Sequence, residues 1–164
     1  VQTCALPILE LGIVDGVVLP HLKLLGEEEV CSFLNEEGRC SIHKDRPGFC
    51  RLFPLGRYYH DGTFSYILQT GECEKGGSVK VKVKTWVDTP RILNYDRYVR
   101  DWHYYCRDMG DVLGTLPQKE RSRLSLYALR LFYGKAYEGD FYVSFYERLA
   151  EAREILWDLK GEGT

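Results

Sequence analysis

The sequence of 164 residues lacks the patterns that identify common catalytic and nucleotide-binding sites. It has no Ser-His-Asp order, no H-E-x-x-H motif, no phosphate-binding glycine loop and no dinucleotide fingerprint, which argues against the enzyme classes that depend on them. It also lacks a basic excess, because the formal net charge is -2. Since nucleic-acid binding needs a basic surface that neutralises phosphates, we expect no nucleic-acid partner.

Uninterrupted hydrophobic runs are also missing. The stretch "LPILELGIVDGVVLPHLKLL" is apolar in character, but Glu10, Asp15, Pro20 and Lys23 interrupt it. It is therefore too broken to cross a bilayer, and no membrane partner is expected. The chain begins with valine, and no basic segment followed by an apolar run opens it. We therefore expect a cytoplasmic protein whose true N-terminus is missing.

Turn signals dominate the chain before Pro90. The segments "GIVDGVVLP" and "RYYHDGTFSYILQ" each place Asp-Gly between apolar runs, which predicts two-residue β-hairpins. The segment "CSFLNEEGRCSI" predicts two further short strands joined by its central polar residues. In "SVKVKVKTWV", valine alternates with lysine, which predicts a half-buried strand with a charged, solvated face.

After Pro90 the hydrophobic period becomes helical. One stripe combines aromatic, aliphatic and sulfur-containing residues at steps of three and four: Ile92, Tyr95, Val99, Trp102, Cys106, Met109 and Leu113. Similar stripes within 124–132 and 142–159 predict two more helices, and we interpret all three stripes, Cys106 included, as core. The predicted fold class is therefore α+β, with a small cysteine-cluster domain of short hairpins and turns followed by about three amphipathic α-helices.

Cysteine is what the sequence has in unusual supply, with six residues in total. In a reducing compartment, clustered cysteines more often bind metal or carry out redox chemistry than form structural disulfides. Four of them, Cys31, Cys40, Cys50 and Cys73, lie in turn-rich, charged surroundings rather than on apolar stripes. No C-x-x-C knuckle is present, so their spacing alone does not identify a zinc site.

Local geometry supplies the argument for metal binding. Cys31 and Cys40 lie on opposite arms of a predicted hairpin, and Asp45-Arg46-Pro47 resembles a helix start that places Cys50 on a short helical turn. Cys73 follows the next hairpin and can return to the same place. Four converging thiolates suit either a tetrahedral zinc ion or an iron–sulfur cluster. The alternative is four thiols buried in a packed core.

Three residues near Cys50 are candidates for a supporting role. Arg46 and Arg51 can donate hydrogen bonds to the thiolates and so tune their pKa, or they can pair with the carboxylates of Glu36, Glu37 or Asp45. Both interpretations stay open. His43 lies three residues after Cys40 and within reach of a shared metal, although a local hydrogen-bonding role is the simpler interpretation.

The segment "CSFLNEEGRCSIHKDRPGFCRLFPLG" resembles the core of the YkgJ-type cysteine-cluster proteins, a zinc- or iron-chelating family named for a CxxCxxCC motif. The shared elements are C-x-F-L, then G-x-C-S-I-[YH], then R-P-x-x-C-R-x-F-P. The later cysteine of the family looks like Cys73. The resemblance implies zinc or iron bound through cysteines, eight of them in the family. The CxxCxxCC motif itself is not in this sequence, so we expect residues 1–8 to be a non-native leader joined to a truncated domain.

These observations predict a cysteine-cluster metal-binding domain at 9–89 and a helical region packed on it at 90–164. The first functional hypothesis is a protein that binds zinc, iron or an iron–sulfur cluster, with Cys31, Cys40, Cys50 and Cys73 as ligands. The second is a metal-dependent redox or protein-modifying enzyme, since a cysteine-cluster module related to this family occurs in flagellin lysine N-methylases. The third is a structural zinc module whose helical half binds a protein partner. Whether the protein is an enzyme stays open.

Overall fold

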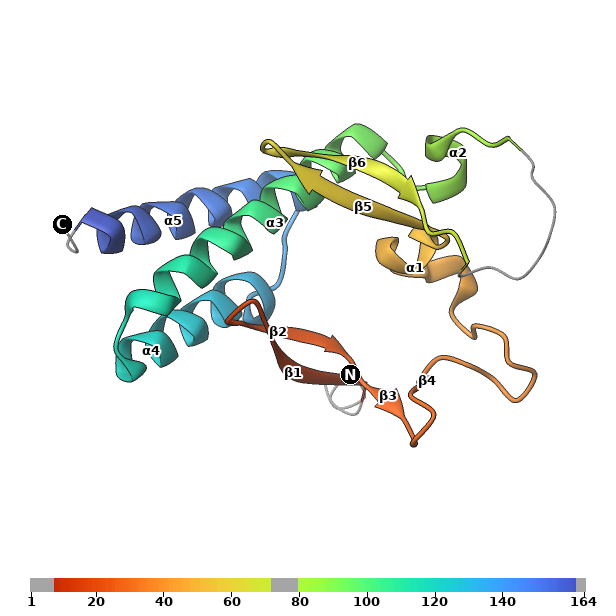
Figure 1. Ribbon diagram of the computed structural model, residues 1–164, viewed down its shortest axis with the longest axis horizontal. Coiled ribbons are helices and arrows are strands. Elements are labelled where there is room, and N and C mark those ends of the chain that lie inside the picture. Colours follow the sequence, from red (N-terminus) through yellow and green to blue (C-terminus); the bar gives the residue numbers. More distant parts are fainter. Residues whose placement is uncertain (1–7, 72–79, 162–164) are drawn as a thin grey trace. The chain divides into compact units, whose positions relative to one another are not determined.

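Short antiparallel hairpins precede three long helices in the computed structural model, which describes residues 8–71 and 80–161 (Figure 1). This confirms the predicted α+β class. The chain divides into two units, which are described separately here: unit 1 comprises 1–34 and 103–164, and unit 2 comprises Asn35–Trp102. The division into domains at 9–89 and 90–164 stays a prediction.

Two hairpins form where Asp-Gly predicted them. Strands β1 (Leu9–Val14) and β2 (Val17–Leu22) pair antiparallel in unit 1. Strands β5 (Leu55–His60) and β6 (Thr63–Leu68) do the same in unit 2. The Asp and the Gly of each turn all have positive φ, as a two-residue type I′ connection requires.

The hairpin predicted within "CSFLNEEGRCSI" is present only in part: its turn forms and is flanked by the single β-bridge residues Leu34 and Cys40, but the pairing of its first strand is wrong. Strand β4 (Val30–Cys31) pairs instead with β3 (Leu24–Leu25), so Leu24 is the partner of Cys31. The polar residues after Leu34 form a turn closed by the Asn35 side chain. The Oδ1 atom of Asn35 accepts hydrogen bonds from the backbone N–H groups of Glu37 (3.1 Å) and Arg39 (2.8 Å). A side chain that takes up backbone donors in this way competes with a strand ladder.

The strand predicted from alternating valine and lysine is also wrong where the structure describes it. Residues 80–82 are irregular, and Val83–Val87 forms the short helix α2. Within α2, Val87 is fully buried, and the Trp86 indole N–H donates to the carbonyl of Phe53 (3.0 Å). Both contacts depend on tertiary packing, which overrides the weak local preference for a strand. The first residues of the predicted strand, 78–79, lie outside the described residues.

The three predicted helices are present: α3 (Ile92–Thr115), α4 (Gln118–Leu129) and α5 (Phe141–Gly161). A π-helical turn follows α4 and ends at Gly134. The Oδ1 atom of Asp140 then accepts the backbone N–H groups of Tyr142 (2.9 Å) and Val143 (3.2 Å), which caps the start of α5. In the described part of the chain, no helix is long and apolar enough to cross a membrane.

Unit 1 has a well-developed hydrophobic core, to which strand β2 and the three long helices contribute. Its buried hydrophobic residues are Val17, Tyr105, Met109, Val112, Leu113, Leu124, Ala128, Phe132, Phe145, Leu149, Ala152 and Leu156. The turn of the β1–β2 hairpin lies directly on α3, because a Cβ atom at Gly110 would collide with the carbonyl oxygen of Asp15. A glycine is therefore required at this crossing.

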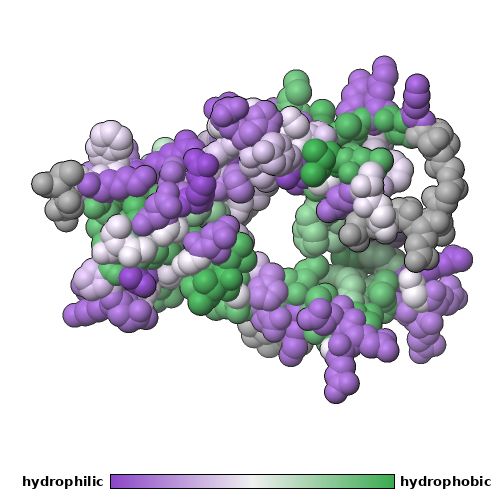
Figure 2. Space-filling model, in the orientation of Figure 1, coloured by the Kyte–Doolittle hydropathy of each residue, from purple (hydrophilic) through white to green (hydrophobic). Residues whose placement is uncertain are grey.

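Unit 2 has almost no core of this kind. Among its described residues, Val87 is the one hydrophobic side chain that is buried. Large apolar side chains around it stay exposed, among them Phe49 (58%), Phe53 (49%) and Trp86 (45%). On the face drawn in Figure 2, hydrophobic side chains in green lie at the surface among hydrophilic ones in purple. Apolar burial alone therefore provides little of the stability of unit 2.

Arg148 is a buried charged residue that holds the segment between α4 and α5. Its guanidinium donates to the carbonyls of Leu131 (2.9 Å), Lys135 (2.8 Å) and Ala136, and it stacks on the ring of Tyr137 at 3.7 Å. Replacing Arg148 with methionine keeps much of the side-chain volume but leaves these carbonyls without their donor. We expect the free energy of unfolding, measured by urea denaturation, to fall by roughly 2–3 kcal/mol.

The matched control is Arg153→Met, on the exposed face of α5. It should change the free energy of unfolding by no more than about 0.5 kcal/mol. Equal losses in the two variants would contradict the stabilising role given to Arg148.

Candidate metal centre

The structure describes three of the four predicted ligands. Cys31 ends strand β4 in unit 1, whereas Cys40 follows the Asn35 turn in unit 2. Cys50 lies in unit 2 on helix α1 (Gly48–Leu52), so its predicted place on a short helical turn is confirmed. These three side chains are half-buried, and none of them forms a disulfide. Cys73 lies outside the described residues.

A complete metal site is not formed by the described residues alone. Within 8–71 and 80–161, no group of three or more His, Cys, Asp or Glu side chains lies close enough together to hold a metal ion. The convergence of Cys31, Cys40, Cys50 and Cys73 thus stays a prediction. The structure describes in detail how one of these residues, Cys50, is held.

Helix α1 begins at Gly48, just after the Asp45-Arg46-Pro47 segment that the sequence suggested as its start. Residues His43–Asp45 form a 3₁₀ turn, and Pro47 precedes the first helical residue without a side-chain cap. Asp45 therefore does not cap α1. The exposed His43 lies on the 3₁₀ turn, on the N-terminal side of α1. A turn and a five-residue helix are too short to be stable by themselves, so side chains must hold Cys50 in place.

Arg51 provides much of this support. Its guanidinium donates to the carbonyls of Lys44 (2.7 Å), Arg46 (3.1 Å) and Asp88 (3.2 Å). It also forms an ion pair of 3.6 Å with the carboxylate of Asp88, an acid that the sequence did not suggest as a partner. Arg51 therefore ties α1 both to the preceding turn and to the end of α2.

Arg46 differs from Arg51 because one of its donors is not used. Its Nε atom is buried and has no hydrogen-bond partner within the described part of the chain. A buried donor without an acceptor is costly, at about 1–3 kcal/mol, and is rare in native proteins. A thiolate is a suitable acceptor, and such donors commonly surround metal-bound sulfur. The chemistry of Arg46 thus fits a negatively charged cysteine site near α1.

Tyr95, near the start of α3, lies against the first residue of α1. A Cβ atom at Gly48 would come within 2.7 Å of Cζ of Tyr95 and closer still to its hydroxyl. The sequence placed Tyr95 on a core stripe and indicated no contact with the cysteine segment. Only the fold brings these two residues together.

A cluster of aromatic and charged side chains surrounds Tyr95 in unit 2. The Arg57 guanidinium donates to the Tyr95 hydroxyl (3.1 Å) and lies over the rings of Phe64, Tyr66 and Tyr95, with distances of 5.3–5.6 Å to the ring centroids. Next to it, the Tyr66 hydroxyl donates to Asp96 (2.6 Å). Burial and this hydrogen bond raise the pKa of Tyr66. The cluster therefore joins the β5–β6 hairpin to the start of α3.

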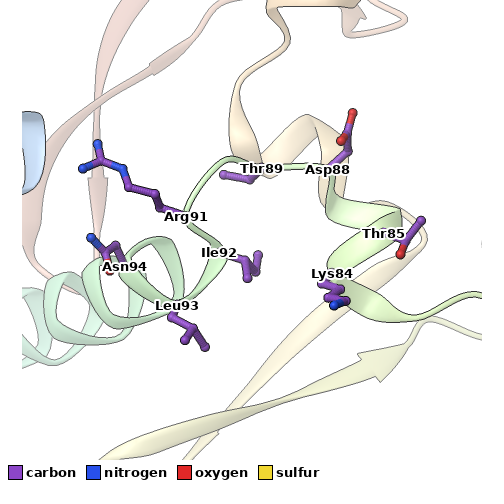
Figure 3. A pocket seen from close by; sticks show the side chains of 8 residues that line it. All are labelled: Lys84, Thr85, Asp88, Thr89, Arg91, Ile92, Leu93 and Asn94. Carbon is purple, nitrogen blue, oxygen red and sulfur yellow. The ribbon is translucent and has the colours of Figure 1, made fainter.

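A separate cavity of about 670 Å³ lies between α2 and the start of α3. Its lining is formed by Lys84, Thr85, Asp88, Thr89, Arg91, Ile92, Leu93 and Asn94 (Figure 3). None of these residues is a cysteine or a histidine, and their side chains extend in different directions rather than toward one point. This cavity is therefore not the candidate metal centre.

Comparison with known proteins bears on the same segment. Residues 12–75 match the family model described as "CxxCxxCC: Putative zinc- or iron-chelating domain". The match confirms the resemblance seen in the sequence, and it includes Cys31, Cys40, Cys50 and Cys73. Neither a curated protein nor a solved structure matches the chain.

Cys106, on α3, is half-buried between the buried residues Tyr105 and Met109. Burial, with a smaller contribution from the charge of Asp15, raises the pKa of the Cys106 thiol to about 12. We expect its alkylation by iodoacetamide, followed by mass spectrometry, to keep accelerating about tenfold per pH unit from pH 8 to pH 10, because the thiolate fraction is still small there. A rate that levels off below pH 9 would contradict the shift.

Proposed function

We propose that the CxxCxxCC-family segment, residues 12–75, binds a zinc or iron ion whose binding free energy stabilises the fold of unit 2. The observation that carries this proposal is the small core of that unit, in which Val87 is the one buried hydrophobic residue among those described. Small domains without a sufficient core usually depend on disulfides, metals or association. Neither Cys40 nor Cys50, both in unit 2, forms a disulfide with a described residue, which favours a metal.

The proposed ligands are Cys31, Cys40, Cys50 and Cys73. Four thiolates satisfy the tetrahedral preference of zinc, and they equally accept an iron–sulfur cluster. When bound, the metal supplies cross-links between segments that are distant in sequence, and the binding free energy then becomes folding free energy. This role agrees with the short, turn-rich elements around Cys40 and Cys50.

Arg46 has the proposed role of a donor to the thiolates. Four thiolates carry four negative charges, and the buried Nε of Arg46 offers a compensating N–H. Arg51 acts indirectly, because its donors hold the carbonyls before α1 and at the end of α2. His43, on the exposed 3₁₀ turn, has the proposed role of a local hydrogen-bonding residue beside the site.

The ligand set is tested by single Cys→Ser variants of the full chain at 31, 40, 50 and 73. Each should lower the zinc or iron that copurifies with the protein, measured by elemental analysis, because serine is a poor ligand for these metals. Each should also lower the urea midpoint of unfolding. The control is Cys106→Ser, which should leave the metal content unchanged. Wild-type metal content in all four variants would overturn the assignment.

The identity of the metal is tested on anaerobically purified protein. A single zinc ion gives a colourless protein without acid-labile sulfide, whereas an iron–sulfur cluster gives a brown protein with both iron and sulfide. A single iron ion gives a protein with iron but without acid-labile sulfide. We expect one of these three results. A protein purified with neither metal, and unable to take up either under reducing conditions, would overturn the proposed function.

A further inference from the structure

The position of Cys50 depends on a contact two residues earlier in the chain. Gly48 opens the five-residue helix α1, and Cys50 is its central residue. The aromatic ring of Tyr95 occupies the space that a side chain at position 48 would need, with Cζ at 2.7 Å and Cε2 at 2.8 Å from the expected Cβ. The absence of a side chain at Gly48 therefore lets α1 approach the start of α3 closely.

Tyr95 is itself held from two directions. Arg57 on β5 donates to its hydroxyl at 3.1 Å and lies over its ring, with 5.3 Å between the guanidinium carbon and the ring centroid. The next residue, Asp96, accepts the hydroxyl proton of Tyr66 on β6 at 2.6 Å. These bonds anchor the first turn of α3 to the β5–β6 hairpin. The surface that Tyr95 presents to Gly48 is therefore fixed by hydrogen bonds from two strands.

The other end of α1 is held independently of Tyr95. Arg51 donates to carbonyls on both sides, and the carbonyl of Phe53, just after the helix, accepts the indole N–H of Trp86. With its far end held, α1 cannot slide away from Tyr95 as a rigid piece. A side chain at position 48 would have to tilt or unwind the helix, and either movement displaces Cys50.

We propose that Tyr95 is a positioning residue for the Cys50 thiolate, acting through its contact with Gly48. This inference rests on the proposed metal-binding function and specifies how one ligand is placed. Metal–sulfur distances tolerate deviations of only about 0.2 Å, so a small tilt of α1 is enough to weaken the bond. Cys50 is thus placed by the fold before a metal arrives.

The experiment uses the full-length reduced chain and the variant Gly48→Ala. Zinc affinity is measured by competition with a chromophoric chelator, and Co²⁺ is used as a spectroscopic probe of thiolate ligation. We expect Gly48→Ala to weaken zinc binding by roughly tenfold or more, as changes around metal ligands typically do. At saturating Co²⁺, the thiolate-to-Co²⁺ charge-transfer band should also shift in wavelength, which a loss of stability alone does not cause.

Gly114→Ala provides the matched control. Gly114 lies in α3, and a Cβ atom there would meet nothing within 4 Å. Alanine is a better helix former than glycine, so this variant should keep both the zinc affinity and the Co²⁺ spectrum of the wild type. It separates the effect of a methyl group at position 48 from that of a Gly→Ala change in general.

A double-mutant cycle identifies Tyr95 as the cause. Tyr95→Ala removes the ring, so adding Gly48→Ala to this variant should weaken zinc binding by less than about threefold. Tyr95→Phe keeps the ring atoms that crowd position 48, so adding Gly48→Ala to it should still weaken binding roughly tenfold. The positioning role is overturned if Gly48→Ala binds zinc like the wild type, or if its effect is the same with and without the ring.

A second measurement keeps this role testable if the wild type binds no metal and the proposed function fails. In the metal-free chain, alkylation of Cys50 by iodoacetamide reports its surroundings, with Cys40 as the internal reference. Gly48→Ala should change the Cys50 rate relative to Cys40 severalfold, and Tyr95→Ala should restore it in the double variant. An unchanged ratio would overturn the positioning role.

Discussion

The close approach of Tyr95 to Gly48 is the contact on which the described part of unit 2 depends most directly. It joins the start of α3 to the helix that carries Cys50, and Arg57 extends it to the β5–β6 hairpin. Because only Val87 is buried among the described hydrophobic residues of this unit, such polar and aromatic contacts replace a conventional core. They define one geometry but supply limited stability, since a typical hydrogen bond contributes only about 1 kcal/mol net.

In unit 1, by contrast, apolar burial contributes more to stability than polar contacts do. Its helices bury a continuous set of aromatic and aliphatic side chains, and the rings of Tyr105, Phe132 and Phe145 follow one another at centroid distances of 5.5 and 6.0 Å. Here apolar burial is the main source of stability, at about 25 cal/mol per Å². In addition, the buried guanidinium of Arg148 donates hydrogen bonds to backbone carbonyls in the segment between α4 and α5. The two units therefore obtain their stability from different interactions.

This difference gives a physical reason why unit 2, which holds the proposed ligands Cys40 and Cys50, would benefit from a bound metal. A metal ion is a compact cross-link that adds stability without requiring a large apolar core. The matched segment, residues 12–75, covers the cysteine-rich stretch and includes none of the three long helices. Positive charge near Cys50 also favours a site of negatively charged thiolates there. The buried Nε of Arg46 and the guanidinium of Arg51 lie in or next to the segment that carries Cys50.

Much of the fold was predictable because its signals are local. Asp-Gly turns determined two hairpins, the 3.6-residue period determined three helices, and the cysteine segment predicted the match of residues 12–75 to the CxxCxxCC domain model. The predictions failed where a distant contact decided the outcome. Alternating valine and lysine predicted a strand, yet α2 forms because Val87 is buried and Trp86 bonds to Phe53.

In the candidate site, too, local features were predictable from the sequence and contacts between distant residues were not. The sequence by itself determined which thiols are candidate ligands and that Cys50 lies on a short helical turn, because residue type and nearby turn signals are local properties. Only the tertiary structure decided that Tyr95 faces Gly48, that Arg51 bonds to Asp88 and that Arg57 stacks on three rings. These partners lie 37 or more residues apart in the first two cases, and no local pattern encodes a contact that forms only when separate elements pack together.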